Sequence, residues 1–311
     1  MSEILTTSAD STMSLRAAPP VLDPWQAQLG GLLLGPGTAY DITDLDGLDE
    51  LPALRTSDED RPWSHGEHDG EDWSAARVIS LGLEVAAEPG LGVTYEQALA
   101  GLRAVMVPTR GARVPFWAYL PTRGVLRWDV KVRRHRILTD TSYEMGLATA
   151  AAQLYAPDPV GYGAELSVST GFRAMTGGLE FDLFTAGSVD TGYLEFGEAG
   201  STGRVEVANA GTAETWPTFT VAGPSPAFEI LDITSGRRLH YVDEVPAGSS
   251  VSLDSATGVV LLDDVADRSG ALVRREWTPI PAASVSSYLF MPLGPASPAA
   301  TLTVTYSPGW W

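Results

Sequence analysis

The feature that most constrains this chain is a series of short apolar segments that recur at regular spacing through its second half. Turn residues separate them, and Ser235-Gly236 and Thr257-Gly258 are typical of hairpin turns. Such spacing is characteristic of an antiparallel β-sandwich or barrel. The sequence therefore predicts strands at Arg204–Ala208, Thr218–Val221, Phe228–Ile233, Arg237–Val242, Ser250–Leu253, Gly258–Leu262, Ala271–Trp277, Ser286–Met291 and Thr301–Tyr306.

One segment of the first half has a helical period instead. Apolar residues recur at helical spacing from Tyr95 to Met106, and Thr94 with Gln97 forms a capping-box pattern ahead of them. Pro108 then ends the segment. We predict one amphipathic helix that packs across an open face of a sheet.

The other strong patterns of the first half have the period of strands. Apolar and polar residues alternate from Arg77 to Val85 and from Leu126 to Arg136, and Pro115–Leu120 is a short apolar strand. In the second pattern one face carries Leu126, Trp128, Val130 and Val132, and the other carries Arg127, Asp129, Lys131 and Arg133. A basic face can bind nucleic acid, but the net charge of −19 favours a solvated or salt-bridged sheet face.

Residues Thr141–Asp158 give conflicting signals. Their alanine content favours a helix by intrinsic propensity. However, Ala148, Ala150 and Ala152 alternate with polar neighbours, and the segment lies between a strand and a Pro-Asp-Pro sequence. We predict a strand.

Residues 41–72 form a long polar segment between a strand-like run at 39–42 and the strand that begins at Arg77. It contains 12 acidic residues and two arginines. Loops of this length are uncommon inside a compact domain unless they contact something else. We predict that its acids pair with the basic face, in the same subunit or in a neighbouring copy. The predicted interface comprises Asp58, Asp60, Asp69 and Asp72 on one side and Arg127, Lys131, Arg133 and Arg134 on the other.

Length and composition bound the remaining possibilities. The 311 residues suffice for two ordinary domains, and we expect residues 1–21 to be a disordered tail, 22–162 a first domain and 163–311 a second. With 39 acids against 20 bases, direct binding of nucleic acid through phosphates is not expected. The apolar run Leu29–Leu34 is too short to span a bilayer, and no secretory signal is evident, so we expect synthesis in a cytoplasm and no membrane insertion.

Residues able to carry chemistry are few. The absence of cysteine excludes disulfides and thiolate metal sites. His65, His68, Asp69 and Asp72 offer nitrogen and oxygen ligands, but His in a polar glycine-rich loop is more often solvated. We find no nucleophile elbow and no phosphate-binding glycine loop. We therefore predict a protein that is not an enzyme and has no catalytic residue, cofactor or metal.

The order of several short motifs resembles the siphophage distal tail proteins, which form the hub at the tip of a long non-contractile phage tail. In the first half they are Asp46-Gly47, Leu51-Pro52, Arg61-Pro62, His65-Gly66, Arg77, Asp158-Pro159 and Tyr162-Gly163. In the second half they are Asn209-Ala210-Gly211-Thr212, Trp216-Pro217-Thr218-Phe219, Val245-Pro246-Ala247-Gly248, Trp277-Thr278-Pro279-Ile280 and the closing TVTYSPGWW. The resemblance covers roughly residues 22–311, and it departs from the family at Pro281-Ala282 and in the acidity of the early loop.

This resemblance implies a mainly β fold: an N-terminal ring-forming β domain with one packed helix, then a C-terminal galectin-like or jelly-roll-like β-sandwich. It implies a virion protein that forms a hexameric ring at the tail tip. Its partners would be further copies of itself, the major tail tube protein and the tail-associated hub or fibre protein. Trp310 and Trp311 would dock on the N-terminal domain or on a neighbour.

An alternative is a carbohydrate-binding module that recognises host cell-wall glycan, because sandwich modules bind sugars with exposed aromatic rings. The candidate rings are those of Trp216, Trp277, Trp310 and Trp311. For the first two we expect a role in the core, so Trp310 and Trp311 are the remaining candidates for ligand contact.

Overall fold

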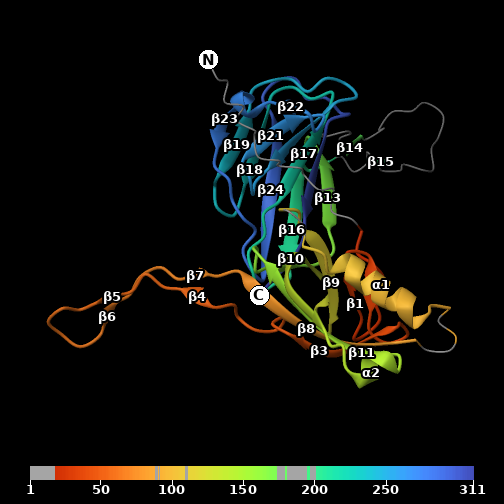
Figure 1. Cartoon of the computed structure of the whole chain (residues 1–311). Coiled ribbons are helices and arrows are strands. Elements are labelled where there is room, and N and C mark those ends of the chain that lie inside the picture. The colour runs from red at the N-terminus through yellow and green to blue at the C-terminus, as the bar shows by residue number, and fades with distance from the viewer. Residues whose placement is uncertain are drawn as a thin grey trace, which may run out of the picture.

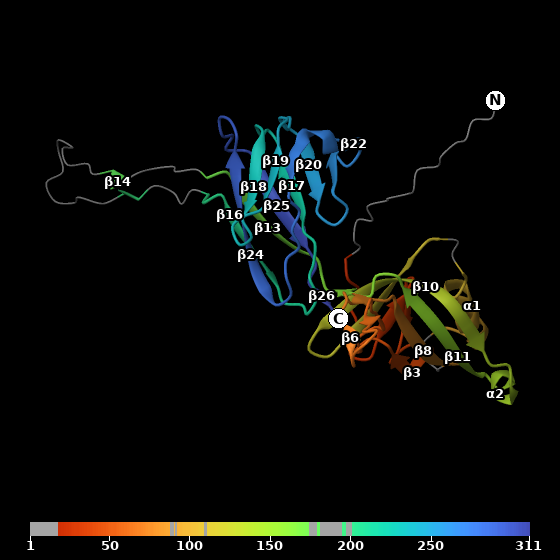
Figure 2. The same cartoon turned by 90° about the vertical axis from the view of Figure 1, so that its left-hand side faces the viewer.

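The structure, a computed structural model, describes residues 18–87, 90, 92–108, 111–173, 179–180, 195–196 and 201–311. The predicted mainly β fold is confirmed: most elements are strands, joined into several antiparallel sheets (Figures 1 and 2). Residues 1–17 of the predicted tail lie outside the described residues. Two separate clusters of buried side chains form the cores, one drawn mainly from residues 27–156 and one from residues 172–306.

The N-terminal core lies on a nine-stranded sheet. Its main path runs β2-β1-β9-β10-β11-β8-β3, and β12 joins β10 to β26 at the side. The strands are β1 (Ala27–Leu29), β2 (Leu32–Leu34), β3 (Tyr40–Asp46), β8 (Arg77–Ala86), β9 (Val114–Leu120), β10 (Gly124–Ile137), β11 (Leu147–Ala156), β12 (Gly161–Tyr162) and β26 (Gly309–Trp310). Alternate side chains of the long strands are buried, as their sequence pattern predicted.

The predicted helix is confirmed as α1 (Tyr95–Val105), which lies across this sheet (Figure 1). Its capping box is present, because Thr94 accepts a hydrogen bond from the Gln97 amide and Gln97 accepts one from the Thr94 amide. Leu99 and Leu102 are buried against the sheet, and the Tyr40 hydroxyl donates to the Ala98 carbonyl at 2.8 Å. The helix therefore closes the N-terminal core.

The strand predicted for Thr141–Asp158 is confirmed for β11 but wrong at its start. Residues Thr141–Glu144 form the short helix α2, capped by the Asp140 carboxylate, which accepts from the Tyr143 amide at 3.1 Å. A local side-chain cap thus overrides the strand pattern for one turn. The alternation that carried the prediction begins only at Leu147.

A β-bulge interrupts the pairing of β10 with β11. Val132 pairs with Leu154 and Arg134 pairs with Gln153, so Arg133 is the extra residue. Beyond the bulge the alternation is shifted by one, and Arg134 points to the same face as Lys131. The bulge therefore places Lys131, Arg133 and Arg134 together on the open face of the sheet. In an unbroken alternation, Arg133 and Arg134 would point to opposite faces.

The C-terminal core lies between two antiparallel sheets, and all nine predicted strands are confirmed. The six-stranded sheet runs β13 (Leu166–Gly171), β25 (Thr301–Tyr306), β17 (Thr218–Ala222), β20 (Ser250–Asp254), β21 (Val259–Leu262) and β22 (Ala266–Asp267). The five-stranded sheet runs β16 (Arg204–Asn209), β24 (Ser284–Pro292), β18 (Phe228–Asp232), β19 (Arg238–Tyr241) and β23 (Leu272–Arg275), and the 3-10 turn η1 (Ser269–Ala271) precedes β23. A separate small ladder pairs β14 (Leu179–Glu180) with β15 (Glu195–Phe196).

The polar segment between β3 and β8 forms an arm that projects far from both cores (Figure 1). Two short ladders build it: β4 (Leu54–Arg55) pairs with β7 (Trp73–Ser74), and β5 (Glu59–Asp60) pairs with β6 (Glu67–His68). Because β3 and β8 are antiparallel neighbours, the arm is one long excursion between adjacent strands of a sheet, as expected from the sequence.

Candidate assembly interface

The arm exposes almost every side chain that it carries. Residues 53–73 are all exposed to solvent except the half-buried Gly70. Among them Trp63 is 96% exposed and Trp73 is 61% exposed, and Leu54 is exposed as well. Exposed apolar side chains of this size on an otherwise acidic projection make the arm a candidate surface for contact with another molecule.

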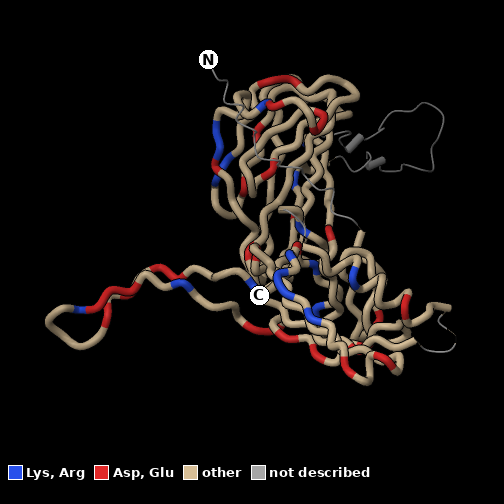
Figure 3. The backbone as a smooth tube through the Cα atoms, viewed as in Figure 1, with Lys and Arg blue, Asp and Glu red and all other residues tan. Residues whose placement is uncertain are grey.

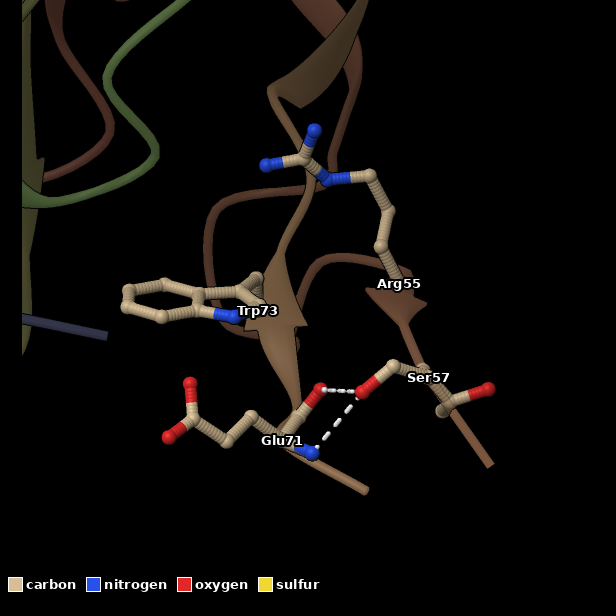
Figure 4. A pocket seen from close by; sticks show the side chains of 5 residues that line it. Arg55, Ser57, Glu71 and Trp73 are labelled. Atoms are coloured by element: carbon tan, nitrogen blue, oxygen red, sulfur yellow. Dashed lines mark hydrogen bonds between the residues drawn. The ribbon is translucent and has the colours of Figure 1, made fainter. Parts of the chain in front are cut away.

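Polar contacts hold the arm in shape near its middle. The Ser57 hydroxyl donates to the Glu71 carbonyl at 3.2 Å and accepts from the Glu71 amide at 2.9 Å (Figure 4). The neighbouring Asp58 carboxylate accepts from the Gly70 amide at 2.9 Å. These contacts fix the register of the two ladders without any buried core.

An open depression lies beside these contacts. Arg55, Thr56, Ser57, Glu71 and Trp73 line it, with Arg55 directly opposite Trp73 across the ladder (Figure 4). Trp and Arg are the residues most enriched among those that dominate protein–protein binding energy. The depression therefore fits a contact with protein better than an enclosed site for a small molecule.

Of the four residues in the predicted basic surface, two contact side chains of their own subunit and two form no ion pair in the described residues. The Arg127 guanidinium is occupied within its own subunit, because it forms an ion pair with Asp129 at 2.8 Å and lies over the Trp117 ring. Arg133 lies over the ring of Tyr155, with 3.6 Å between the guanidinium carbon and the ring centre. In the described part of the chain, Lys131 and Arg134 form no ion pair, and Arg134 is exposed.

The acids of the arm do not reach this basic surface. Among the described residues Asp58, Asp60, Asp69 and Asp72 form no ion pair, and Figure 3 shows the arm extending away from the basic strand β10. Of the two options left open by the sequence, pairing within one subunit is therefore not seen. Pairing with a neighbouring copy stays a prediction.

A buried arginine holds the root of the arm. The Arg77 side chain is 1% exposed, and its Nη1 donates to the carbonyls of Gly47, Leu48 and Glu50 at 2.7, 3.2 and 2.9 Å. Its Nε donates to the Pro159 carbonyl at 2.7 Å. Burial lowers the pKa of the Arg77 guanidinium below its ordinary value, and the nearby carboxylate of Glu50 opposes that effect.

Sequence reasoning did not assign this role to Arg77. A signal was present, because Arg77 stands at the same parity as the buried Ile79 and Leu81 in the alternating strand. A charged residue at an inward position is rarely tolerated unless it is hydrogen-bonded. The carbonyl partners could not be inferred, because they lie in the irregular root of the arm.

A second arginine, Arg123, joins the arm root to the end of the chain. Its Nη2 lies 2.6 Å from the Asp49 carboxylate, and its Nη1 donates to the Trp311 carbonyl at 3.1 Å. The guanidinium carbon also lies 5.8 Å from the centre of the Trp310 ring. Arg123 therefore contacts the arm and the C-terminal strand at once.

The four candidate tryptophans do not share a surface. Trp310 packs against the N-terminal core, and its strand β26 pairs with β12. Trp277 packs against the C-terminal core as expected, but the core role expected for Trp216 is wrong, because that residue is 38% exposed. The Trp311 amide donates to the Thr212 hydroxyl at 3.0 Å. The carbohydrate-binding alternative stays a prediction.

The residues considered for a metal lie on the arm. His68 is in β6, opposite Glu59, and His65 lies in the connection between β5 and β6. Within the described ranges, no three His, Asp or Glu side chains are grouped closely enough to hold a metal ion. In those same ranges, no helix has the length and apolar character needed to cross a membrane.

Comparison with known proteins finds a similar fold among solved structures but no match in sequence. No protein-family model and no curated protein sequence matches the chain. The fold is similar to the Dit protein (gp 19.1) of phage SPP1, described as a paradigm of the hub adsorption apparatus in phages that infect Gram-positive bacteria. The TM-score is 0.63 at 12% identity, and the match covers 92% of this chain and 99% of that one.

Two structures of the phage P2 baseplate, in its activated conformation with Ca and with Sr, also match. Each has a TM-score of 0.48 at 11% identity and covers 90% of this chain and 97% of the other. The similarity to the SPP1 protein establishes a shared fold over nearly the whole of both chains.

Proposed function

We propose that this protein is a structural component of the tail tip of a long-tailed, non-contractile phage. Copies of it would close a ring, six by the family resemblance, between the tail tube and the hub or host-attachment apparatus. The likeness in fold to a phage hub protein supports this function, and it extends over both cores rather than one module. The ring would be a virion component without enzymatic activity.

The arm is the observation that carries the proposal. It projects from its own chain, exposes Trp63 and Trp73, and leaves the carboxylates of residues 53–73 without cationic partners in the described residues. A second copy offers what the arm lacks: Lys131 and Arg134 on the open face of the N-terminal sheet. Complementary charge of this kind gives an interface its register and its partner choice.

The geometry of this contact favours a closed assembly of several copies. The arm and the basic face are different surfaces, so each copy would donate an arm to one neighbour and receive an arm from another. Such head-to-tail contacts generate a ring when the rotation between copies closes. The tube protein and the hub or fibre protein would then contact the two axial faces of the ring.

The solution mass of the purified protein tests the proposal. We expect light scattering at low salt to give about six times the 33.0 kDa chain mass, falling toward the monomer as salt rises. A monomer at every concentration and salt, also in the presence of tube and hub proteins, contradicts the proposed ring.

Charge reversal tests the contact itself. In the double variant Arg133→Glu and Arg134→Glu, the basic face would repel the acidic arm, so we expect the assembled mass to disappear while the monomer stays folded. The matched control reverses Arg173 and Arg268, two exposed arginines of the C-terminal domain that form no ion pair in the described residues. If the Arg133→Glu, Arg134→Glu variant assembles as the wild type does, the proposed charge pairing is wrong.

A further inference from the structure

The root of the arm and the docking of the C-terminal domain use the same two arginines. Arg77 binds the carbonyls of the arm root with Nη1 and the Pro159 carbonyl, which lies just before β12, with Nε. Arg123 binds the Asp49 carboxylate of the arm root with one nitrogen and the Trp311 carbonyl with the other. Each guanidinium therefore contacts both the arm root and the segments that connect the two domains.

The connection held by these arginines is small. Beyond the β12–β26 pairing of Gly161 and Tyr162 with Trp310 and Gly309, it includes the Gly163 amide, which donates to the Pro308 carbonyl at 2.9 Å. In the C-terminal domain the Ala213 amide donates to the Gly309 carbonyl, also at 2.9 Å. A two-residue strand pair of this kind opens more readily than the long strands of either core.

Among the described residues, the arm between residues 53 and 73 adds no side chain to either core. Residues 53–73 are exposed apart from Gly70, so its direction relative to the sheet is set at the root. The root itself is confined, because Gly47 has a φ of +87° and a Cβ added there would lie 2.2 Å from the Val78 carbonyl oxygen. The contacts of Arg77 and Arg123 therefore lie at residues 47–50, where the arm leaves the sheet.

From these contacts we propose that Arg77 and Arg123 are positioning residues that couple the direction of the arm to the docking of the C-terminal domain. A partner that orders the arm would tighten the β12–β26 contact, and release of the C-terminal strand would loosen the arm. Such coupling is reciprocal by thermodynamic necessity. The inference concerns one chain and does not depend on the proposed ring.

The first test perturbs the arm root and measures the domain connection. In Asp49→Asn the root loses its ion pair with Arg123, and we expect the Gly163 and Ala213 amides to exchange hydrogen about fivefold faster in the monomer. Asp60→Asn is the matched control, because it removes the same charge from an arm residue away from the root. Asp49→Glu should keep the protection, because it retains a carboxylate that can pair with Arg123.

The second test perturbs the C-terminal strand and measures the arm. The chain has no cysteine, so Ser64→Cys on the arm and Ala104→Cys on α1 give a unique pair of spin labels. In Trp310→Ala, the ring beneath Arg123 is lost, and we expect the distance distribution between the labels to broaden. Val273→Ala, at an exposed position on β23 of the C-terminal domain, should leave it unchanged.

The Asp49→Asn and Trp310→Ala variants together test whether the arm and the C-terminal domain are coupled. Faster amide exchange in Asp49→Asn with a broader arm distribution in Trp310→Ala supports the coupling. An effect on one side only, or on neither, overturns it. If Trp310→Ala does not fold, the Asp49→Asn exchange rates decide alone, since that carboxylate is largely exposed and lies outside both cores.

Discussion

The arm and the pair β8–β11 are both antiparallel ladders, yet they are stabilised in different ways. Along β8 and β11 every second side chain enters the N-terminal core, beneath α1. Along the arm the side chains face solvent, and contacts of Ser57 and Asp58 hold the register. An isolated two-stranded hairpin is at best marginally stable in water. The sheet is complete in one chain, whereas the arm has the character of a surface that a second molecule completes.

The largest expected effect of a single substitution lies on the sheet side of this comparison. Trp128 is buried against Phe116 in the core. We expect Trp128→Ala to lower the free energy of unfolding of the N-terminal domain by about 3–5 kcal/mol, because it leaves a large cavity. Urea denaturation followed by circular dichroism measures this loss. A change below about 1 kcal/mol would show that the sheet does not depend on its core.

A smaller loss is expected where the sheet meets the C-terminal strand. A Cβ added at Gly161 would lie 2.4 Å from Cζ2 of Trp128, a buried ring with no room to move. We expect Gly161→Ala to cost about 1–3 kcal/mol of stability by overpacking. Gly163→Ala is the matched control for the thermal unfolding measurement, because its nearest neighbouring atom would be 3.7 Å away. Equal effects at the two glycines would refute the packing explanation.

A smaller loss of stability is expected from a substitution at the N-cap of α1, the helix that closes the N-terminal core. Thr94→Ala removes the hydroxyl that accepts from the Gln97 amide at 3.3 Å, and loss of such a cap typically costs about 1 kcal/mol. Thr94→Ser keeps the hydroxyl and should keep most of the stability in the same urea denaturation. An alanine variant as stable as the wild type would mean that packing alone holds α1 on the sheet.

The smallest effect on the monomer is expected on the arm. Trp73→Ala should change the free energy of unfolding by less than about 0.5 kcal/mol, because the ring is exposed and belongs to neither core. If the arm binds a second copy, the same variant should shift the mass measured by light scattering toward the monomer at lower protein concentration. A loss of monomer stability as large as that of Trp128→Ala would contradict this expectation, because it would show that the arm, like the sheet, stabilises the folded monomer.

Much of the fold was predictable because its strands bury alternate residues. The alternation from Leu126 to Val132 predicts which side chains point into the core, and the capping box before Tyr95 predicts where the helix begins. The bulge at Arg133 was not predictable, because nothing in the local sequence distinguishes an extra residue from the next residue of a regular strand. The face on which Arg134 lies could therefore come only from the structure.

The arm was predicted in part, and its role as an interface stays a prediction. Its acidic content and length marked residues 41–72 as a contact segment. The ladder between Glu59–Asp60 and Glu67–His68 was not foreseen, because Asp and Glu are depleted in strands and give no alternating signal there. The roles of Arg77 and Arg123 also escaped prediction, since their partners are mostly backbone carbonyls, which every residue offers alike.

The bulge at Arg133 has a consequence in genetic terms. Without Arg133, Val132 and Arg134 would be consecutive residues that pair with Leu154 and Gln153. The alternation of inward and outward side chains would then be regular through Ile137. The bulge is thus equivalent to a one-codon insertion that adds a positive charge to the open face and leaves unchanged the residues that the core receives. An assembly surface at this place could gain or lose charge by single codons without a new fold.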